Sequence, residues 1–134
     1  MPRRSPQPKR DGMPEVPPIL LVDDDPQMRH VIRSALEDDG LAVETAADGR
    51  QALDQASRRR PRLVILDMGL PLLDGVGLAA ELRALYGDGV PLVVITADGH
   101  VVEKARRVSA RAYLAKPFEL EELSAAVQQA LGGR

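Results

Sequence analysis

Charged and hydroxyl side chains stand directly after four separate apolar runs of this sequence, and their types suit one kind of chemistry. They are Asp23 and Asp24 after residues 19–22, Asp67 after residues 63–66, Thr96 after residues 92–95, and Lys116 after residues 112–115. If the runs are parallel strands of one sheet, these side chains emerge together at its carboxyl edge, where open α/β folds place their ligands. Three carboxylates, a hydroxyl and an ammonium in one crevice suit a divalent cation and a phosphoryl group.

The carboxylates set the strongest physical requirement on such a site. Unit charges about 4 Å apart repel by roughly 4 kcal/mol at an effective dielectric of 20, so three of them need a compensating cation or a bound proton. Ligands that are all oxygen favour Mg²⁺. We therefore predict a Mg²⁺ site at Asp23, Asp24 and Asp67. A single aspartate after a strand is more often a helix cap, which is the role that we expect for Asp25 and Asp48.

Strand-like and helix-like patterns alternate from residue 19 onward. In addition to the four apolar runs, a short strand is expected at residues 42–46. Helices are expected from Pro26 to a stop at Gly40, from near Asp48, around a stripe of Leu78, Leu82 and Leu85, over residues 101–108, and around Leu120, Leu123, Val127 and Leu131. Five strands that alternate with five helices predict an α/β fold, with one doubly wound parallel sheet covered by helices on both faces.

Composition limits the classes of protein to consider. The 134 residues suit a single domain, and the absence of cysteine excludes disulfides and thiolate metal sites. No apolar stretch is long enough to span a membrane, and the N-terminus has no apolar leader segment, so a cytoplasmic protein is expected. The formal net charge of −2 argues against nucleic acid as a partner of the folded part.

Residues 1–18 differ in composition from the rest of the chain. They hold six of the eleven prolines and four basic residues, without apolar periodicity. We predict a disordered extension here, followed by a folded domain at residues 19–131. A solubilising tail and a segment that contacts an acidic partner or nucleic acid both remain open.

Four stretches together resemble the receiver domain of bacterial two-component response regulators, of the stand-alone chemotaxis type. They are residues 20–25, 66–75, 94–97 and 113–118. Each stretch is a weak signal alone, but their order and spacing are specific. The resemblance covers about residues 19–131 and implies a flavodoxin-like sheet with strand order 2-1-3-4-5. A stand-alone receiver and a domain excised from a longer protein both remain open.

The resemblance also implies a role for each site residue. Asp67 would accept a phosphoryl group from a histidine kinase or a histidine phosphotransfer protein. Mg²⁺ would be bound directly by Asp24, Asp67 and the backbone carbonyl of Gly69, and through a water by Asp23. Lys116 would pair with the phosphoryl oxygens. The peptide bond between Lys116 and Pro117 would be cis. The phosphorylated domain, a monomer or weak dimer, would then act on a downstream protein that the sequence does not identify.

The same resemblance implies a switch that links the site to the surface. Thr96 would donate its hydroxyl to the phosphoryl group, and Tyr113 would turn inward as Thr96 moves. A surface lysine at 116 and a half-buried strand aromatic at 113 are the simpler alternatives. The interval from Thr96 to Lys116 is 20 positions, which is shorter than in a typical receiver, and Gly99 stands where the fourth helix should start. We therefore predict that this helix and the loop before it are shortened or mobile.

Two other function classes remain open. One is a constitutive interaction module that keeps the fold without being phosphorylated, against which the complete set of site residues argues. The other is a phosphohydrolase with an aspartyl-phosphate intermediate. Phosphatases of the haloacid dehalogenase type need a second aspartate two residues after the nucleophile, and that position here is Gly69.

Overall fold

Five short segments form the strands of one parallel sheet, in the predicted order β2-β1-β3-β4-β5. Their bounds are Ile19–Val22 for β1, Val43–Ala46 for β2, Leu63–Asp67 for β3, Leu92–Thr96 for β4 and Ala112–Ala115 for β5. The computed structural model describes residues 16–69 and 75–132. Most of the predicted extension, and residues 70–74 of the second motif stretch, lie outside the described residues.

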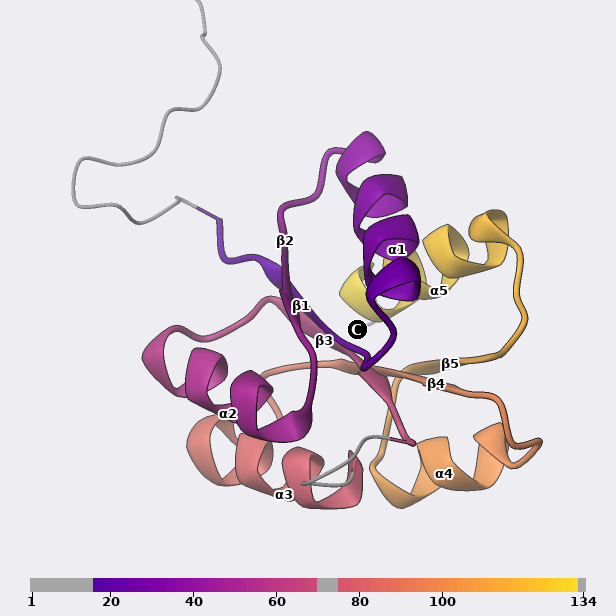
Figure 1. Cartoon of the computed structure of the whole chain (residues 1–134). Coiled ribbons are helices and arrows are strands. Elements are labelled where there is room, and N and C mark those ends of the chain that lie inside the picture. The colour runs from indigo at the N-terminus through magenta and orange to yellow at the C-terminus, as the bar shows by residue number, and fades with distance from the viewer. Residues whose placement is uncertain (1–15, 70–74, 133–134) are drawn as a thin grey trace, which may run out of the picture.

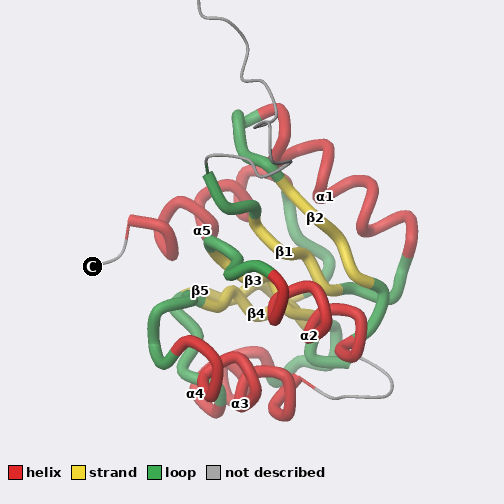
Figure 2. The backbone as a smooth tube through the Cα atoms, turned by 90° about the vertical axis from the view of Figure 1, so that its left-hand side faces the viewer, coloured by secondary structure: helices red, strands yellow, loops and turns green. Residues whose placement is uncertain are grey.

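Five helices cover the two faces of this sheet. They are α1 (Pro26–Asp38), α2 (Gly49–Arg58), α3 (Gly75–Tyr86), α4 (Val101–Arg107) and α5 (Leu120–Gly132). Helices α1 and α5 lie together on one face, and α2, α3 and α4 lie on the other (Figures 1 and 2). This is the doubly wound α/β architecture that the alternating patterns predict.

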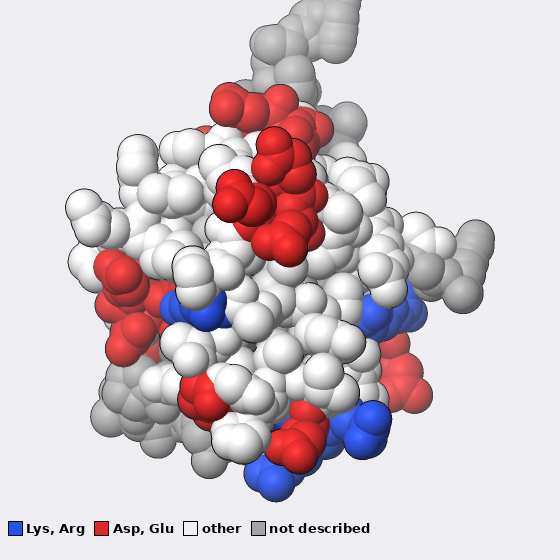
Figure 3. All heavy atoms as spheres, turned by 90° about the vertical axis from the view of Figure 1, so that its right-hand side faces the viewer, with Lys and Arg blue, Asp and Glu red and all other residues white. Residues whose placement is uncertain are grey.

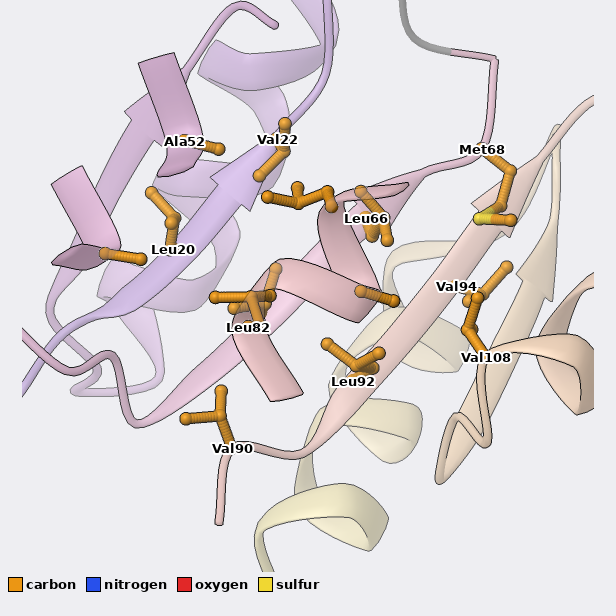
Figure 4. Close-up of a cluster of buried hydrophobic side chains, with 14 of the residues drawn as sticks. Leu20, Val22, Ala52, Leu66, Met68, Leu82, Val90, Leu92, Val94 and Val108 are labelled. Carbon is orange, nitrogen blue, oxygen red and sulfur yellow. The ribbon is translucent and has the colours of Figure 1, made fainter. Parts of the chain in front are cut away.

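Strand side chains alternate between two apolar layers, because successive residues of a strand point to opposite faces. In β1, Leu20 and Val22 pack toward α2, α3 and α4, whereas Ile19 and Leu21 pack toward α1 and α5. The strands β3 and β4 divide in the same way, and Figure 4 shows the layer on the α3 side. All residues of β1, β3 and β4 are buried. A sheet covered on both faces explains why these strands are continuous apolar runs.

Both predicted aspartate caps are confirmed. The Asp25 carboxylate accepts the backbone N–H of Gln27 at 2.9 Å, and the Asp48 carboxylate accepts that of Gln51 at 2.9 Å. Proline follows Asp25 at the first position of α1, where its missing N–H costs nothing. These caps fix where α1 and α2 begin relative to the strands before them.

Two leucines assigned to buried stripes are exposed, so those details of the prediction were wrong. Leu85 is 46% exposed and Leu120 is 45% exposed. In α3 the buried face continues through Tyr86 instead, and its hydroxyl donates to the carbonyl of Ala56 in α2. Leu120 is the first residue of α5, and it precedes the part of the helix that packs against the sheet.

Within the described residues, the first buried residue is Pro18. Its carbonyl accepts the N–H of Arg62 at 2.9 Å. Val16, by contrast, is 52% exposed. No helix in the described part of the chain is long and apolar enough to cross a membrane.

Candidate metal and phosphoryl site

Strand register brings the predicted site residues together at the carboxyl edge of the sheet. Val22 of β1 aligns with Leu66 of β3, so the aspartates that follow, Asp23 and Asp67, are neighbours. Because side chains alternate along a strand, Asp23 points to the same face as Leu21, and Asp67 to the same face as Ile65. This is the face covered by α1 and α5. The parallel order of the strands therefore accounts for the first two members of the site.

The three predicted carboxylates form one cluster. Asp23, Asp24 and Asp67 each offer an oxygen, and these oxygens lie within 4.8 Å of one another. Asp23 is fully buried and Asp67 is 8% exposed, whereas Asp24 is exposed. The cluster thus has a buried floor and one carboxylate at its open side.

Lys116 reaches this cluster from β5. Its ammonium lies 3.1 Å from Asp23 Oδ2 and 3.4 Å from Asp67 Oδ2, and only 19% of its side chain is exposed. Burial alone would lower the pKa of Lys116, but the hydrogen bond to Asp23 and the charges of Asp67 and Asp23 together raise it. The lysine is therefore held as a cation between two carboxylates.

Asp23 is the most constrained of the three aspartates. Its Oδ1 accepts the N–H of Asp25 at 2.9 Å, and its Oδ2 bonds to Lys116. Burial raises the pKa of Asp23 and outweighs these two hydrogen bonds, which lower it; the nearby charge of Asp67 raises it further. The site therefore holds more negative charge than Lys116 alone compensates, which is the condition that favours a bound cation.

Gly69 is tied directly to Asp67. Its backbone N–H donates to Asp67 Oδ1 at 3.0 Å, which turns the chain back at the end of β3. The backbone N–H of Met68, between them, donates to the carbonyl of Ile95 in β4. These bonds place the Gly69 main chain at the rim of the acidic cluster, where a metal-binding carbonyl is expected.

The side chains of Thr96 and Tyr113 point to the opposite face of the sheet from those of Asp23 and Asp67. Thr96 is 3% exposed, and its position in β4 gives it the side-chain direction of Val94, toward α4. Tyr113 pairs with Val94 in the adjacent strand, so it projects to the same face, and it is 48% exposed. Within the described residues, the Thr96 hydroxyl makes no hydrogen bond to the carboxylates or to Lys116.

The main chain nevertheless connects Thr96 to the lysine. The backbone N–H of Lys116 donates to the carbonyl of Thr96 at 2.9 Å. The peptide bond from Lys116 to Pro117 is cis, as predicted. The ends of β4 and β5 are thus joined by a main-chain hydrogen bond next to the cluster.

Sequence reasoning missed one polar contact of the site. Arg29, in the first turns of α1, donates from Nη1 to the backbone carbonyl of Asp23 at 2.9 Å. The available signal was its spacing. Arg29 lies four positions after Asp25, and side chains of a helix tilt toward its N-terminus, which here is the end next to the site. Nothing in the sequence shows that the side chain folds back to the strand.

Charge on the face around the site is mixed. The loops after β4 and β5 lie on the right-hand side of Figure 1, and Figure 3 turns that side toward the viewer. Acidic side chains form separate clusters there, and Lys and Arg lie mostly in its lower half. The described residues form no continuous basic surface on this face, of the kind that binds nucleic acid phosphates.

A family model described as the response regulator receiver domain matches residues 19–128. Among curated relatives, Response regulator MprA of Mycolicibacterium vanbaalenii is 44% identical over 115 residues, which cover 84% of this chain and 49% of the relative. MprA of Mycobacterium leprae is 43% identical over the same length. The chain therefore spans about half the length of the curated relatives that it matches.

Solved receiver domains have the same fold. The receiver domain of the sensor histidine kinase PA1611 of Pseudomonas aeruginosa, described with magnesium coordinated in its active site cleft, is 37% identical with a TM-score of 0.79 and covers 88% of this chain and 99% of its own. The receiver domain of NtrX from Brucella abortus is 34% identical with a TM-score of 0.79, and covers 87% and 99% respectively.

Proposed function

This chain belongs to the response regulator receiver domain family, and we propose that Asp67 is its phosphoacceptor in a two-component phosphorelay. The observation that carries the proposal is that Asp67 belongs to the carboxylate cluster and lies beside the Lys116 ammonium. Phosphoryl transfer depends on positioning and charge neutralisation more than on other covalent chemistry of the protein. The position of Asp67 beside Lys116 and the other carboxylates supports this role, with a bound cation completing the charge balance.

The donor set fits Mg²⁺, because it consists only of oxygen atoms and leaves an open side at Asp24. Asp24, Asp67 and the Gly69 carbonyl would bind it directly, and Asp23 through a water. When bound, the ion neutralises the carboxylates and the transferring phosphoryl oxygens.

The reaction on the protein side begins with an Asp67 carboxylate oxygen. It attacks phosphorus and forms a P–O bond as the P–N bond of a phosphohistidine donor breaks, and the departing imidazole retains its electron pair and gains a proton. The product is an aspartyl phosphate. Lys116 then exchanges part of its contact with Asp67 for a phosphoryl oxygen, and Thr96 donates its hydroxyl to another.

The phosphorylated domain then acts through contact with a downstream protein. Thr96 and Tyr113 lie on adjacent strands and share a face of the sheet, which supports a coupled movement of the two side chains. Inward rotation of Tyr113 would alter the surface around β5, where the ring is now 48% exposed.

Intact mass spectrometry after incubation with acetyl phosphate and Mg²⁺ tests the phosphoacceptor. The wild-type chain should gain one phosphoryl group, and Asp67→Asn should gain none. Asp54→Asn is a matched control, because Asp54 is an exposed aspartate that pairs with Arg58 in α2, away from the cluster. Equal labelling of the Asp67→Asn protein would refute the assignment.

The class of phosphodonor needs a separate experiment. Purified histidine kinases and histidine phosphotransfer proteins, labelled with radioactive phosphate on histidine, are each incubated with the chain for short times. We expect rapid transfer from at least one of them, and no transfer to Asp67→Asn. Labelling by acetyl phosphate but by none of these proteins would contradict the phosphorelay role and leave the phosphoacceptor assignment intact.

A further inference from the structure

A side chain outside the predicted site holds the peptide group that joins its first two aspartates. Arg29 extends from α1, and its Nη1 donates to the main-chain carbonyl of Asp23 at 2.9 Å. The arginine is partly buried, and this bond directs its guanidinium toward the end of β1. The other arginine of the same helix, Arg33, is exposed.

That carbonyl occupies a special place in the chain. It belongs to the peptide bond between Asp23 and Asp24, and because a peptide unit is planar, a hydrogen bond to its oxygen also orients the nitrogen and Cα of Asp24. Asp23 has further restraints, since its N–H donates to the Ala46 carbonyl at 3.2 Å and its carboxylate bonds Asp25 and Lys116. Asp24 is exposed and depends on its neighbours for its direction.

We infer that Arg29 is a positioning residue of the metal site: it fixes the Asp23–Asp24 peptide so that the Asp24 carboxylate stays directed into the cluster. The inference rests on the proposed function of the cluster as a Mg²⁺ site. Among the described residues, the Arg29 guanidinium bonds the Asp23 carbonyl and forms no ion pair with the three carboxylates, so its proposed role is to position them. Its guanidinium suits the task because it stays charged and presents its donors in a rigid plane.

Two effects of Arg29 on cation binding have opposite signs, which makes the inference testable. Its positive charge repels a cation, so loss of the charge alone would tighten Mg²⁺ binding. Loss of the tie to the Asp23 carbonyl would loosen Asp24 and weaken binding. Residues that orient metal ligands typically change metal affinity by about tenfold or more when they are replaced. A weaker affinity therefore identifies positioning, and a tighter one identifies electrostatics.

The test is a Mg²⁺ titration of the full chain, followed by amide chemical shifts, with Arg29→Met, Arg29→Lys and Arg33→Met as variants. Arg33 lies one turn farther along α1 and forms an exposed pair with Glu37, so its replacement is the matched control. We expect Arg29→Met to bind Mg²⁺ about tenfold more weakly, Arg29→Lys to recover part of the loss, and Arg33→Met to match wild type.

Thermal unfolding without Mg²⁺ separates positioning from general damage to the fold. Arg29→Met should be folded at the titration temperature, so that its affinity is measured on native protein. Unchanged or tighter Mg²⁺ binding in folded Arg29→Met would overturn the inference while the proposed metal site stands. Absence of Mg²⁺ binding by the wild-type chain would overturn both. An equal loss of affinity in Arg33→Met would show that substitutions in α1 weaken binding whether or not they touch the Asp23 carbonyl, and would also overturn the inference.

Discussion

Two segments leave the carboxyl edge of the sheet beside the acidic cluster, and their construction differs. The segment from β1 to α1 starts at the fully buried Asp23, is capped by Asp25, and leads into a helix of 13 residues. The segment from β4 to α4 starts at the buried Thr96 but then runs through four exposed residues, 97–100, into a helix of seven. His100 at the start of that helix provides no side-chain cap.

The bonds that hold the second segment are exposed ones. Asp98 accepts the N–H of His100 at 2.9 Å and forms an ion pair with Lys104, whose side chain is 28% exposed. The hydrogen bond from Lys104 lowers the pKa of Asp98, as does that from the His100 N–H. Gly99 between them has a φ of 85°, a conformation that other residues rarely adopt. Surface ion pairs of this kind stabilise only weakly.

This difference suggests that the two segments have different roles around the proposed phosphoacceptor, Asp67. Segments held by few buried contacts and by exposed hydrogen bonds open locally at low free-energy cost, and switching elements come from such segments. The β1–α1 side therefore suits a metal site that is present before phosphorylation. The β4–α4 side, which carries Thr96, suits a response to it.

The largest expected effect comes from removing the open carboxylate of the β1–α1 side. Asp24→Asn should lower Mg²⁺ affinity by more than about tenfold, because it replaces a charged ligand of the proposed site with a neutral amide, and loss of even an outer-sphere partner commonly costs that much. Phosphorylation by acetyl phosphate should fall with it. Calorimetry of Mg²⁺ binding is the measurement, with Asp54→Asn as control, and an undiminished affinity in Asp24→Asn would refute the ligand assignment.

On the β4–α4 side, Thr96→Ala should separate chemistry from response. A shift of a two-state population from 1:99 to 99:1 needs about 5.5 kcal/mol, and one neutral hydrogen bond supplies only about 1 kcal/mol. Thr96→Ala should still accept phosphate, but the loss of this hydrogen bond should reduce the amide shifts over residues 101–118. Thr96→Ser, which retains a hydroxyl, should keep most of the wild-type response. A full wild-type pattern in Thr96→Ala would show that coupling takes another route.

In the absence of Mg²⁺, the free energy of unfolding should depend on pH through Asp23, the buried carboxylate of the site. Because the pKa of Asp23 is raised above its ordinary value of 3.8, the fold binds its proton more tightly than the unfolded chain does. The stability associated with Asp23 is fully present below pH 3.8 and is lost as pH rises through the raised value. The difference in unfolding free energy between wild type and Asp23→Asn should therefore change in that window. A difference that is flat with pH would contradict the assignment.

The smallest expected effects come from two aspartates that each accept a backbone N–H two residues later. Asp25→Ala should destabilise the protein by about 1 kcal/mol, as loss of a helix cap does. Asp98→Ala should have a smaller effect on global unfolding, and should raise hydrogen exchange mainly over residues 98–107. Denaturant unfolding and amide exchange measure the two. Equal global destabilisation by both variants would remove the contrast between the segments.

Much of the site followed from local signals. Parallel strand ends meet at one edge, so the positions of Asp23, Asp67 and Lys116 after apolar runs were enough to predict their contact. The capping aspartates carried an equally local signal. Four motif-bearing segments in the expected order then indicated strand order, which periodicity alone does not.

Other features depend on packing between distant segments and were beyond that reasoning. Periodicity placed Leu85 on a buried stripe, but the contact of Tyr86 with α2 determines which face of α3 turns inward. The bond from Arg29 to Asp23 requires a long side chain to fold back across a turn. Whether Thr96 approaches a phosphoryl group stays a prediction, because its hydroxyl does not contact the carboxylates here.

The most direct test of the two-sided account is a map of amide chemical shifts with Mg²⁺, before and after addition of beryllofluoride, which mimics the phosphoryl group on aspartate. We expect Mg²⁺ alone to shift residues 23–25 and 67–69, and beryllofluoride to add its largest further shifts over residues 96–116, with little further change in α1. Further shifts concentrated in α1, with residues 96–116 unchanged, would contradict the account.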